Sequence, residues 1–293
     1  MSRAETVSAP VAEASVRPRP LWTLGLFHDE LRTTFRRWRT LALLGVLAAV
    51  PVLVGIAVRI ETGDGSAGGG GGPAFVSQIT SNGLFLVFTA LAATLPFFLP
   101  MAVGVVAGDA VAEAGAGTLR YLLVAPAGRS RLLLTKYATV MVFCLAATLV
   151  VAVSALAAGA LLFPLGDLTT ISGTRITFGE GLVRALLIAL VVAASLLGVA
   201  ALGLFVSTLT NSGIAAMATT VGLLITVQIL DQIPQLHALH PYLFSHYWLS
   251  FADLMREPVY WDDLTKNLGL QALYAAVFGS AAWARFTTKD VTA

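Results

Sequence analysis

The sequence predicts an all-α, polytopic membrane protein with six transmembrane helices, an N-terminal amphipathic interfacial helix and a short cytoplasmic coupling helix. Two observations predict this class. Of 293 residues, 57% are apolar and only 12% are charged, whereas roughly a quarter of the residues in soluble domains are charged. The apolar residues also gather in runs of the ~20 residues that a membrane span requires.

The same composition excludes other classes of protein. The net charge is only +2, so a nucleic-acid partner is not expected. The single cysteine, Cys144, lies in an apolar run and cannot form an internal disulfide. We therefore expect neither a disordered chain nor a disulfide-rich secreted fold, and we expect Cys144 to serve as a small apolar filler.

Two segments, residues 1–22 and residues 23–39, precede the first span. Residues 1–22 are rich in Ala, Pro and Arg and predict a disordered cytoplasmic leader, whereas residues 23–292 predict a single transmembrane domain. Within that domain, residues 23–39 predict an amphipathic helix, because apolar side chains recur at steps of three and four: Leu24, Phe27, Leu31, Phe35 and Trp38. Such a helix lies in the membrane interface with its basic face toward lipid phosphates. A soluble helix packed on the loops is the alternative.

Six apolar runs are long enough to span the membrane. They cover residues 41–60, 83–108, 137–163, 182–206, 213–230 and 268–284. Pro96 and Pro100 predict a kink in the second span, which a helical bundle tolerates because neighbouring helices satisfy the freed carbonyls. Gly104 and Gly108 form a G-x-x-x-G at the end of that span, and this spacing allows close contact with another helix.

The distribution of Lys and Arg predicts the orientation. Thirteen of the 18 basic residues fall on the side that holds the leader, the 109–136 loop, the 207–212 turn and the tail. Because basic loops stay in the cytoplasm, both termini are predicted to be cytoplasmic. Arg outnumbers Lys 15 to 3 alongside abundant Ala, Gly and Val, which indicates a GC-rich bacterial genome and hence a bacterial plasma membrane.

The opposite side is predicted to hold three outer loops. The first includes Gly68–Gly72, a run typical of a flexible linker. The second, residues 164–181, is short and polar. The third, residues 231–266, carries seven aromatic residues, which favour the headgroup level. We interpret it as one or two short helices at, or dipping into, the outer interface; a small folded extracellular loop is the alternative.

Catalytic motifs are missing from the sequence. Neither G-x-x-x-x-G-K-[ST] nor H-E-x-x-H occurs. Ser212 and the downstream histidines could suggest a serine protease, but they are predicted on opposite sides of the membrane. His237 and His240 have a helical metal-ligand spacing, but no acidic or Cys cluster surrounds them in sequence. We therefore expect no enzyme activity, no catalytic residue, no metal and no cofactor bound by this chain.

The 109–136 loop carries the most specific pattern. Gly117 allows a break, Thr118 can cap a short helix that ends at Leu123, Pro126 breaks the chain again, and Ser130 can cap the third span. The pattern predicts a short helix held crosswise between two spans. Such a helix suits a chain that receives force from a partner.

At this loop the sequence resembles the permease subunit of ABC-2-type (type V exporter-like) transporters. The resemblance lies in a Glu followed by Gly-Thr-Leu, a Leu pair, Pro-x-x-Arg and a Lys: here Glu113, Gly117, Thr118, Leu119, Leu122, Leu123, Pro126, Arg129 and Lys136. The family commonly has a second acidic residue where this chain has Gly115. Residues 286–291 resemble the Phe–basic–Asp ending of bacterial members, and the whole likeness covers about residues 22–292.

The resemblance implies the function of an ATP-driven exporter subunit. It implies ATPase-coupling roles for Glu113, Gly117, Thr118, Arg120, Pro126, Arg129 and Lys136. It implies two partners besides the lipid bilayer: separate ABC ATPase subunits, which bind ATP and Mg, and a second permease subunit in a homodimer or heterodimer. The substrate would be a drug, lipid, peptide or similar molecule. An ATP-independent carrier or scaffold protein is the alternative, and the absence of a partner ATPase would favour it.

Overall fold

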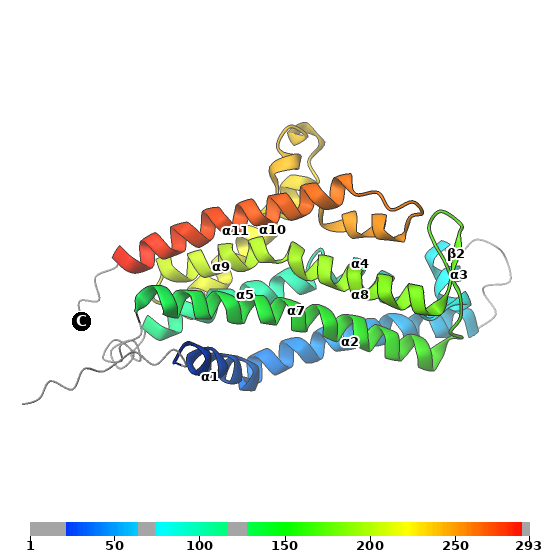
Figure 1. The fold of residues 1–293 in the computed structure, drawn as a ribbon, viewed down its shortest axis with the longest axis horizontal. Coiled ribbons are helices and arrows are strands. Elements are labelled where there is room, and N and C mark those ends of the chain that lie inside the picture. The colour runs from blue at the N-terminus through cyan, green and yellow to red at the C-terminus, as the bar shows by residue number, and fades with distance from the viewer. Residues whose placement is uncertain (1–21, 64–73, 116–127, 289–293) are drawn as a thin grey trace, which may run out of the picture.

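The computed structural model describes residues 22–63, 74–115 and 128–288. Two of the sequence predictions, most of the 1–22 leader and the Gly68–Gly72 run, lie outside these residues. The described chain is almost entirely helical, and its long helices lie side by side in one elongated bundle (Figure 1). The helices are α1 (Trp22–Arg36), α2 (Trp38–Gly63), α3 (Ala74–Ser81), α4 (Phe85–Thr94), α5 (Phe98–Gly115), α7 (Arg129–Leu162), α8 (Phe178–Ser195), α9 (Leu197–Leu209), α10 (Gly213–Asp231) and α11 (Asp262–Thr288).

The remaining elements are short. β1 (Leu168–Thr169) and β2 (Arg175–Ile176) form an antiparallel hairpin between α7 and α8. Three 3₁₀ helices join α10 to α11: η2 (Pro234–Leu236), η3 (His240–Tyr242) and η4 (Trp248–Met255). Short helices were predicted for this segment; its place at a membrane interface stays a prediction.

The structure confirms the prediction of a membrane-embedded, all-α protein. Among the described residues, α2, α7, α10 and the α8–α9 pair are long and apolar enough to cross a membrane, and α4 with α5 adds a fifth crossing if the bent pair counts as one span. Large apolar side chains cover the outside of these helices, including Leu161 (85% exposed) and Ile214 (76% exposed). A soluble surface does not expose so many apolar side chains, whereas lipid is a suitable solvent for them.

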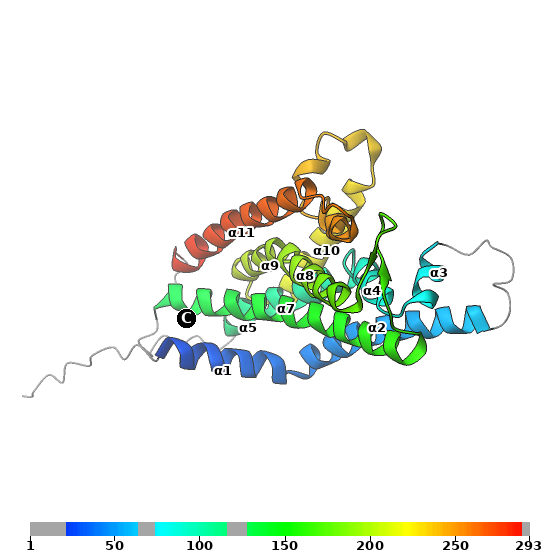
Figure 2. The same ribbon diagram turned by 45° about the vertical axis from the view of Figure 1, so that its right-hand side comes forward.

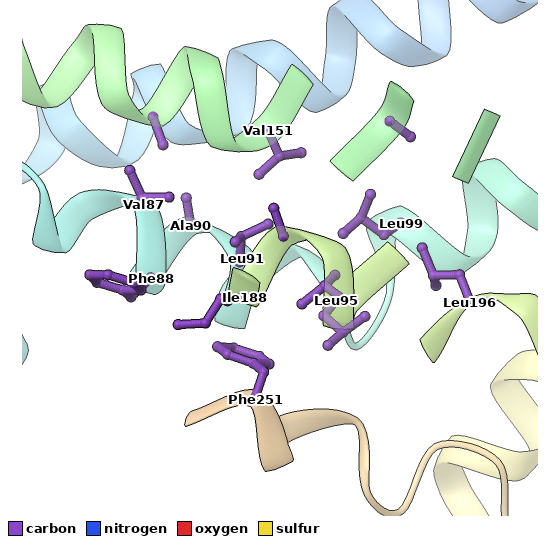
Figure 3. Close-up of a cluster of buried hydrophobic side chains, with 14 of the residues drawn as sticks. Val87, Phe88, Ala90, Leu91, Leu95, Leu99, Val151, Ile188, Leu196 and Phe251 are labelled. Atoms are coloured by element: carbon purple, nitrogen blue, oxygen red, sulfur yellow. The ribbon is translucent and has the colours of Figure 1, made fainter. Parts of the chain in front are cut away.

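Two of the predicted spans are interrupted. The α4 and α5 axes differ by 54° across a break that contains Pro96, so the predicted kink in the second span is confirmed. The second interruption, at Leu196 between α8 and α9, is slight: Leu196 keeps a right-handed helical backbone, and residues 178–209 still form one span. It was not predicted because no Pro marks it. Buried side chains near both positions belong to the core (Figure 3), where Leu91, Leu95 and Leu196 are fully buried.

The sixth predicted span lies within α11 but does not reach the apolarity of the others. The reason lies in two amides, Asn267 and Gln271, which lower the hydropathy of the helix although both are buried against its neighbours. On the outward side, Leu273 and Val277 are exposed.

Glycines set the closest helix contacts. A Cβ on Gly83, just before α4, would lie 2.3 Å from the carbonyl oxygen of Gly159 in α7, so the two backbones touch. A Cβ on Gly108 would lie 3.0 Å from the Met217 backbone in α10. The predicted close helix contact at the Gly104–Gly108 motif is thus confirmed, with α10 as its partner.

Candidate functional site: a charged pocket at the end of the bundle

One end of the bundle gathers the elements that flank the predicted coupling loop. The C-terminal end of α5 and the N-terminal end of α7 lie there, together with α1, the α9–α10 junction and the C-terminal end of α11 (Figures 1 and 2). Side chains tie these ends together. Ser207 Oγ in α9 accepts hydrogen bonds of 2.9 Å from the backbone N–H groups of Val111 and Ala112. Trp283 Nε1 in α11 donates to Ser130 Oγ in α7 at 2.9 Å.

A charged pocket lies at this end. We use this name for Glu30, Arg37, Arg39, Asp109 and Lys136 and the space between them. Lys136 Nζ in α7 lies 2.8 Å from Glu30 Oε1 in α1. Asp109 Oδ2 in α5 lies 2.7 Å from Arg37 Nη1 and 3.2 Å from Arg39 Nη2. Four helices therefore meet through ion pairs at one place.

The two inner groups of the pocket are strongly shielded from solvent. The side chains of Asp109 and Lys136 are each only 9% exposed, whereas those of Arg37 and Arg39 are 38% and 51% exposed. A buried charge is costly unless a partner compensates it. The pairs thus hold α1 and the start of α2 against α5 and α7, and breaking a pair leaves a buried charge behind.

The space between these groups is about 510 Å³, including the part that opens to solvent. Thr34, Thr40 and Thr139 line it beside the charged side chains, as do the apolar Leu43, Val106 and Val140. The lining therefore mixes polar and apolar residues from α1, α2, α5 and α7.

The kink between α1 and α2 aims the two arginines at Asp109. The predicted helix 23–39 ends at Arg36, Arg37 forms a bend, and Trp38 begins α2. The continuous helix predicted to residue 39 is therefore wrong in its last turn. The bend lets side chains two positions apart, Arg37 and Arg39, reach the same carboxylate, which a regular helix does not permit.

The apolar side chains predicted to line one face of residues 23–39 differ in how deeply they are buried. Phe35 packs against the core, with its ring 6.2 Å from that of Phe143 in α7. Phe27 and Leu31 are half-buried, and Trp38 is 81% exposed. Arg32 and Arg36 are exposed. The helix is amphipathic as predicted, while its contact with lipid stays a prediction.

The predicted coupling residues have different outcomes. Glu113 falls in the last turn of α5 and Arg129 begins α7, so they stand on the two flanks of the loop. Gly117, Thr118, Arg120 and Pro126 lie outside the described residues, as does the short helix predicted after Thr118. Lys136 is buried and bound to Glu30, so in this conformation it faces α1 and not an exterior partner.

Three predictions about single residues can be compared with the structure. Ser130 does not cap α7, because Gly128 occupies the N-cap and Ser130 Oγ accepts from Trp283. Ser212, considered above as a nucleophile, caps α10 by accepting from the Ala215 N–H. Cys144 is fully buried among apolar side chains, which agrees with its predicted role as a filler.

A buried ladder of polar side chains crosses the bundle where α8 joins α9. Asn267 Nδ2 in α11 donates to Ser195 Oγ at 2.7 Å, and Gln271 Nε2 donates to the Phe244 carbonyl at 2.7 Å. Both amides are at most 2% exposed. Sequence reasoning does not find this ladder, since the partners of Asn267 and Gln271 lie 72 and 27 positions away in the chain. Buried polar residues in membrane proteins are expensive and often functional.

These features define a class. The chain is a membrane-embedded helical bundle with one sharply bent helix pair, a charged pocket at one end and a polar ladder in its interior. A comparison with protein families makes the assignment narrower: the chain belongs to a family of proteins of unknown function, DUF2705, whose model matches residues 70–292. The match includes α5 and α7 of the charged pocket and begins after α1. A search of curated proteins finds no match.

Proposed function

We propose that the chain is the permease subunit of an ATP-driven exporter of the ABC-2 type. The observation that carries the proposal is the attachment of α1 and of the bend that follows it: Glu30 in α1 binds Lys136 at 2.8 Å, and Arg37 in the bend binds Asp109 at 2.7 Å. Lys136 and Asp109 bound the loop that resembles the coupling segment of these permeases. A displacement of that loop would therefore reach α1 and the first span through two charged contacts.

The proposed movement uses the break between α4 and α5. A push on the loop acts on the C-terminal end of α5 and the N-terminal end of α7. Because α5 meets α4 at 54°, a change of this angle can move one end of the span without moving the other. Hinges at helix ends are the usual sites of such changes.

The proposal includes six spans, with α11 as the sixth and both termini in the cytoplasm of a bacterial cell. Two observations support α11 as a span. Its polar amides, Asn267 and Gln271, face the bundle interior, while Leu273, Val277 and Trp283 on its outer side are more than half or about half exposed. With an even number of spans, the basic leader and basic tail lie on the same side, as the positive-inside rule requires.

In this proposal the chain supplies no catalytic group. ATP and Mg bind to separate ABC ATPase subunits, which dock on the loop, and a second permease subunit completes the transport path. The interior of the bundle favours an apolar or amphipathic substrate, such as a drug, lipid or peptide, because its buried residues are mainly aliphatic.

Substitutions on the two flanks of the loop test the proposal. Glu113→Ala and Arg129→Ala should lower the ATPase activity that depends on the assembled transporter by about tenfold, as expected for loss of a charge contact at an interface, while membrane insertion stays intact. Arg32→Ala provides a matched control, since Arg32 is an exposed charge on α1. Unchanged coupling in both loop variants would overturn the assignment of the loop.

A further inference from the structure

At the C-terminal end of α10, three side chains of metal-ligand type meet. One carboxylate oxygen of Asp231 and one ring nitrogen each of His240 and His246 all lie within 4.8 Å of one another. His246 Nδ1 is 2.9 Å from Asp231 Oδ1, and the two imidazole rings have centroids 5.7 Å apart. We call this group the Asp–His–His cluster. The sequence spacing had suggested His237 with His240, but His237 is exposed and takes no part in the cluster.

The 3₁₀ segment after α10 builds the cluster. Asp231 ends α10, η2 turns the chain, and η3 begins at His240. Backbone hydrogen bonds close each turn, from the His237 N–H to the Pro234 carbonyl and from the Tyr242 N–H to the Leu239 carbonyl. The chain then runs inward, and Leu243 and Phe244 are buried. His246 follows on the next turn and meets Asp231 from the other side.

A hydrogen bond orients the ring of His240. Its Nε2 lies 3.1 Å from the Ile233 carbonyl oxygen. A carbonyl can only accept, so Nε2 carries the hydrogen and Nδ1 keeps a lone pair. Metal-binding histidines are commonly fixed in this way, by donation of the second ring N–H to a carbonyl.

The distances suit a small tetrahedral ion. Zinc ligands at 2.0–2.1 Å from the metal lie about 3.3 Å from each other. The Asp231–His246 pair is already at 2.9 Å, so it needs to open by only a few tenths of an ångström. His240 needs to approach by no more than about 1.5 Å, which is within the reach of side-chain rotation. The side chains of Asp231 and His246 are 14% and 33% exposed, so an ion can enter from solvent.

We propose that Asp231, His240 and His246 bind one divalent transition-metal ion of the zinc class. Two imidazoles and one carboxylate favour zinc and its neighbours over magnesium or calcium, which prefer oxygen ligands. The ion takes the place of the hydrogen that lies between His246 Nδ1 and Asp231 Oδ1. The neutral imidazole then carries its hydrogen on Nε2, so the step moves that hydrogen from one ring nitrogen to the other. A water molecule completes the fourth position.

The bound ion would join α10 to the segment that contacts α11. Close to the cluster, Tyr274 Oη donates to the Tyr242 carbonyl at 2.9 Å, and Gln271 Nε2 donates to the Phe244 carbonyl. A metal at the cluster therefore fixes the position of the 3₁₀ segment relative to both helices. This inference is independent of the proposed transport function.

Zinc titration of the purified, full-length protein tests the proposal. The protein carries no histidine tag, is freed of metal with a chelator and is kept in detergent. Calorimetry with zinc chloride should give one site per chain, and zinc should raise the melting temperature. His240→Ala and His246→Ala should each weaken binding by at least about tenfold. His237→Ala, a histidine in the same segment but outside the cluster, should bind within about twofold of the wild type.

The melting temperature of each metal-free variant shows whether it is folded. Should His240→Ala fail to fold, His246→Gln serves in its place, because His246 is the more exposed ligand. The absence of stoichiometric zinc binding to the wild type would overturn the proposal. Equal binding by the wild type and by folded variants of His240 or His246 would do the same.

Discussion

The ion pair between Glu30 and Lys136 allows the strongest test of the charged pocket. Its two side chains are 22% and 9% exposed, and their charged atoms lie 2.8 Å apart. At an effective dielectric constant of 20, two unit charges at this distance attract by about 6 kcal/mol. Most of that attraction offsets the cost of removing both charges from water. The net value of the pair is therefore small, but the cost of leaving one charge alone is large.

Three variants separate the net stabilisation by the ion pair from the cost of leaving one charge without its partner. Glu30→Leu leaves the Lys136 ammonium buried, and Lys136→Met leaves the Glu30 carboxylate alone. Each should destabilise the protein by about 2–3 kcal/mol, below the 3–5 kcal/mol of a fully buried pair because Glu30 keeps some solvent contact. For a chain of this size that corresponds to a fall in melting temperature on the order of 3–5 °C. The double variant replaces both charges with apolar groups and should lie within about 1 kcal/mol of the wild type.

Thermal unfolding in detergent, followed by tryptophan fluorescence, measures the cycle. Lys266→Met is the control, because Lys266 belongs to an exposed pair with Asp262 and exposed pairs contribute about 0–1 kcal/mol. If the effects of the two single substitutions simply add in the double variant, the residues do not interact, and the proposed attachment of α1 to α7 is wrong.

Further predictions concern α5, the closest backbone contact and the polar ladder. Asp109→Asn should destabilise the protein by about 1–2 kcal/mol, because two guanidinium groups lose their carboxylate but are 38% and 51% exposed and so keep contact with solvent; the same unfolding assay measures it. Gly83→Ala should cost at least about 2 kcal/mol, since its Cβ would lie 2.3 Å from the Gly159 carbonyl oxygen; Gly222→Ala, where the space is open, should be neutral or stabilising in parallel melts. Asn267→Leu removes the donor to Ser195 and should cost about 1–3 kcal/mol; an unchanged melting temperature would show that the ladder adds no stability.

The sequence predicted the helical class, because apolar runs and a shortage of charge are properties of the whole chain. It also predicted the kink at Pro96, since proline removes a backbone donor wherever it stands in a helix. The interruption at Leu196 could not be predicted in this way. There the backbone stays right-handed but the Leu196 N–H bonds to the Ala193 carbonyl, and nearby Ser195 finds its partner, Asn267, 72 positions later in the chain.

The charged pocket was only partly predictable. Lys136 was selected through a motif, and Asp109 was recognised as a charge at the end of a span. Their partners, Glu30 and Arg37, lie 106 and 72 positions away. The bend at Arg37 that brings them together depends on how α1 docks on α7, which no local pattern reveals.

The Asp–His–His cluster illustrates the same limit. Helical spacing pairs His237 with His240, but no helix runs from one to the other, because η2 ends at Leu236 and η3 begins only at His240. The fold brings His246 and Asp231, 15 positions apart, within hydrogen-bonding distance. In an irregular segment, the sequence spacing of possible ligands does not show which of them meet; the path of the folded chain does.

Co-purification with an ATPase tests most directly the central claim, that this chain is the permease subunit of an ATP-driven exporter. The tagged protein is isolated from native membranes in mild detergent, with and without ATP and Mg, and the co-purifying subunits are identified by mass spectrometry. The proposed function predicts an ABC ATPase in roughly equal amounts, with nucleotide-dependent association that Glu113→Ala weakens. A stable complex or monomer that contains no nucleotide-binding subunit under either condition would contradict it.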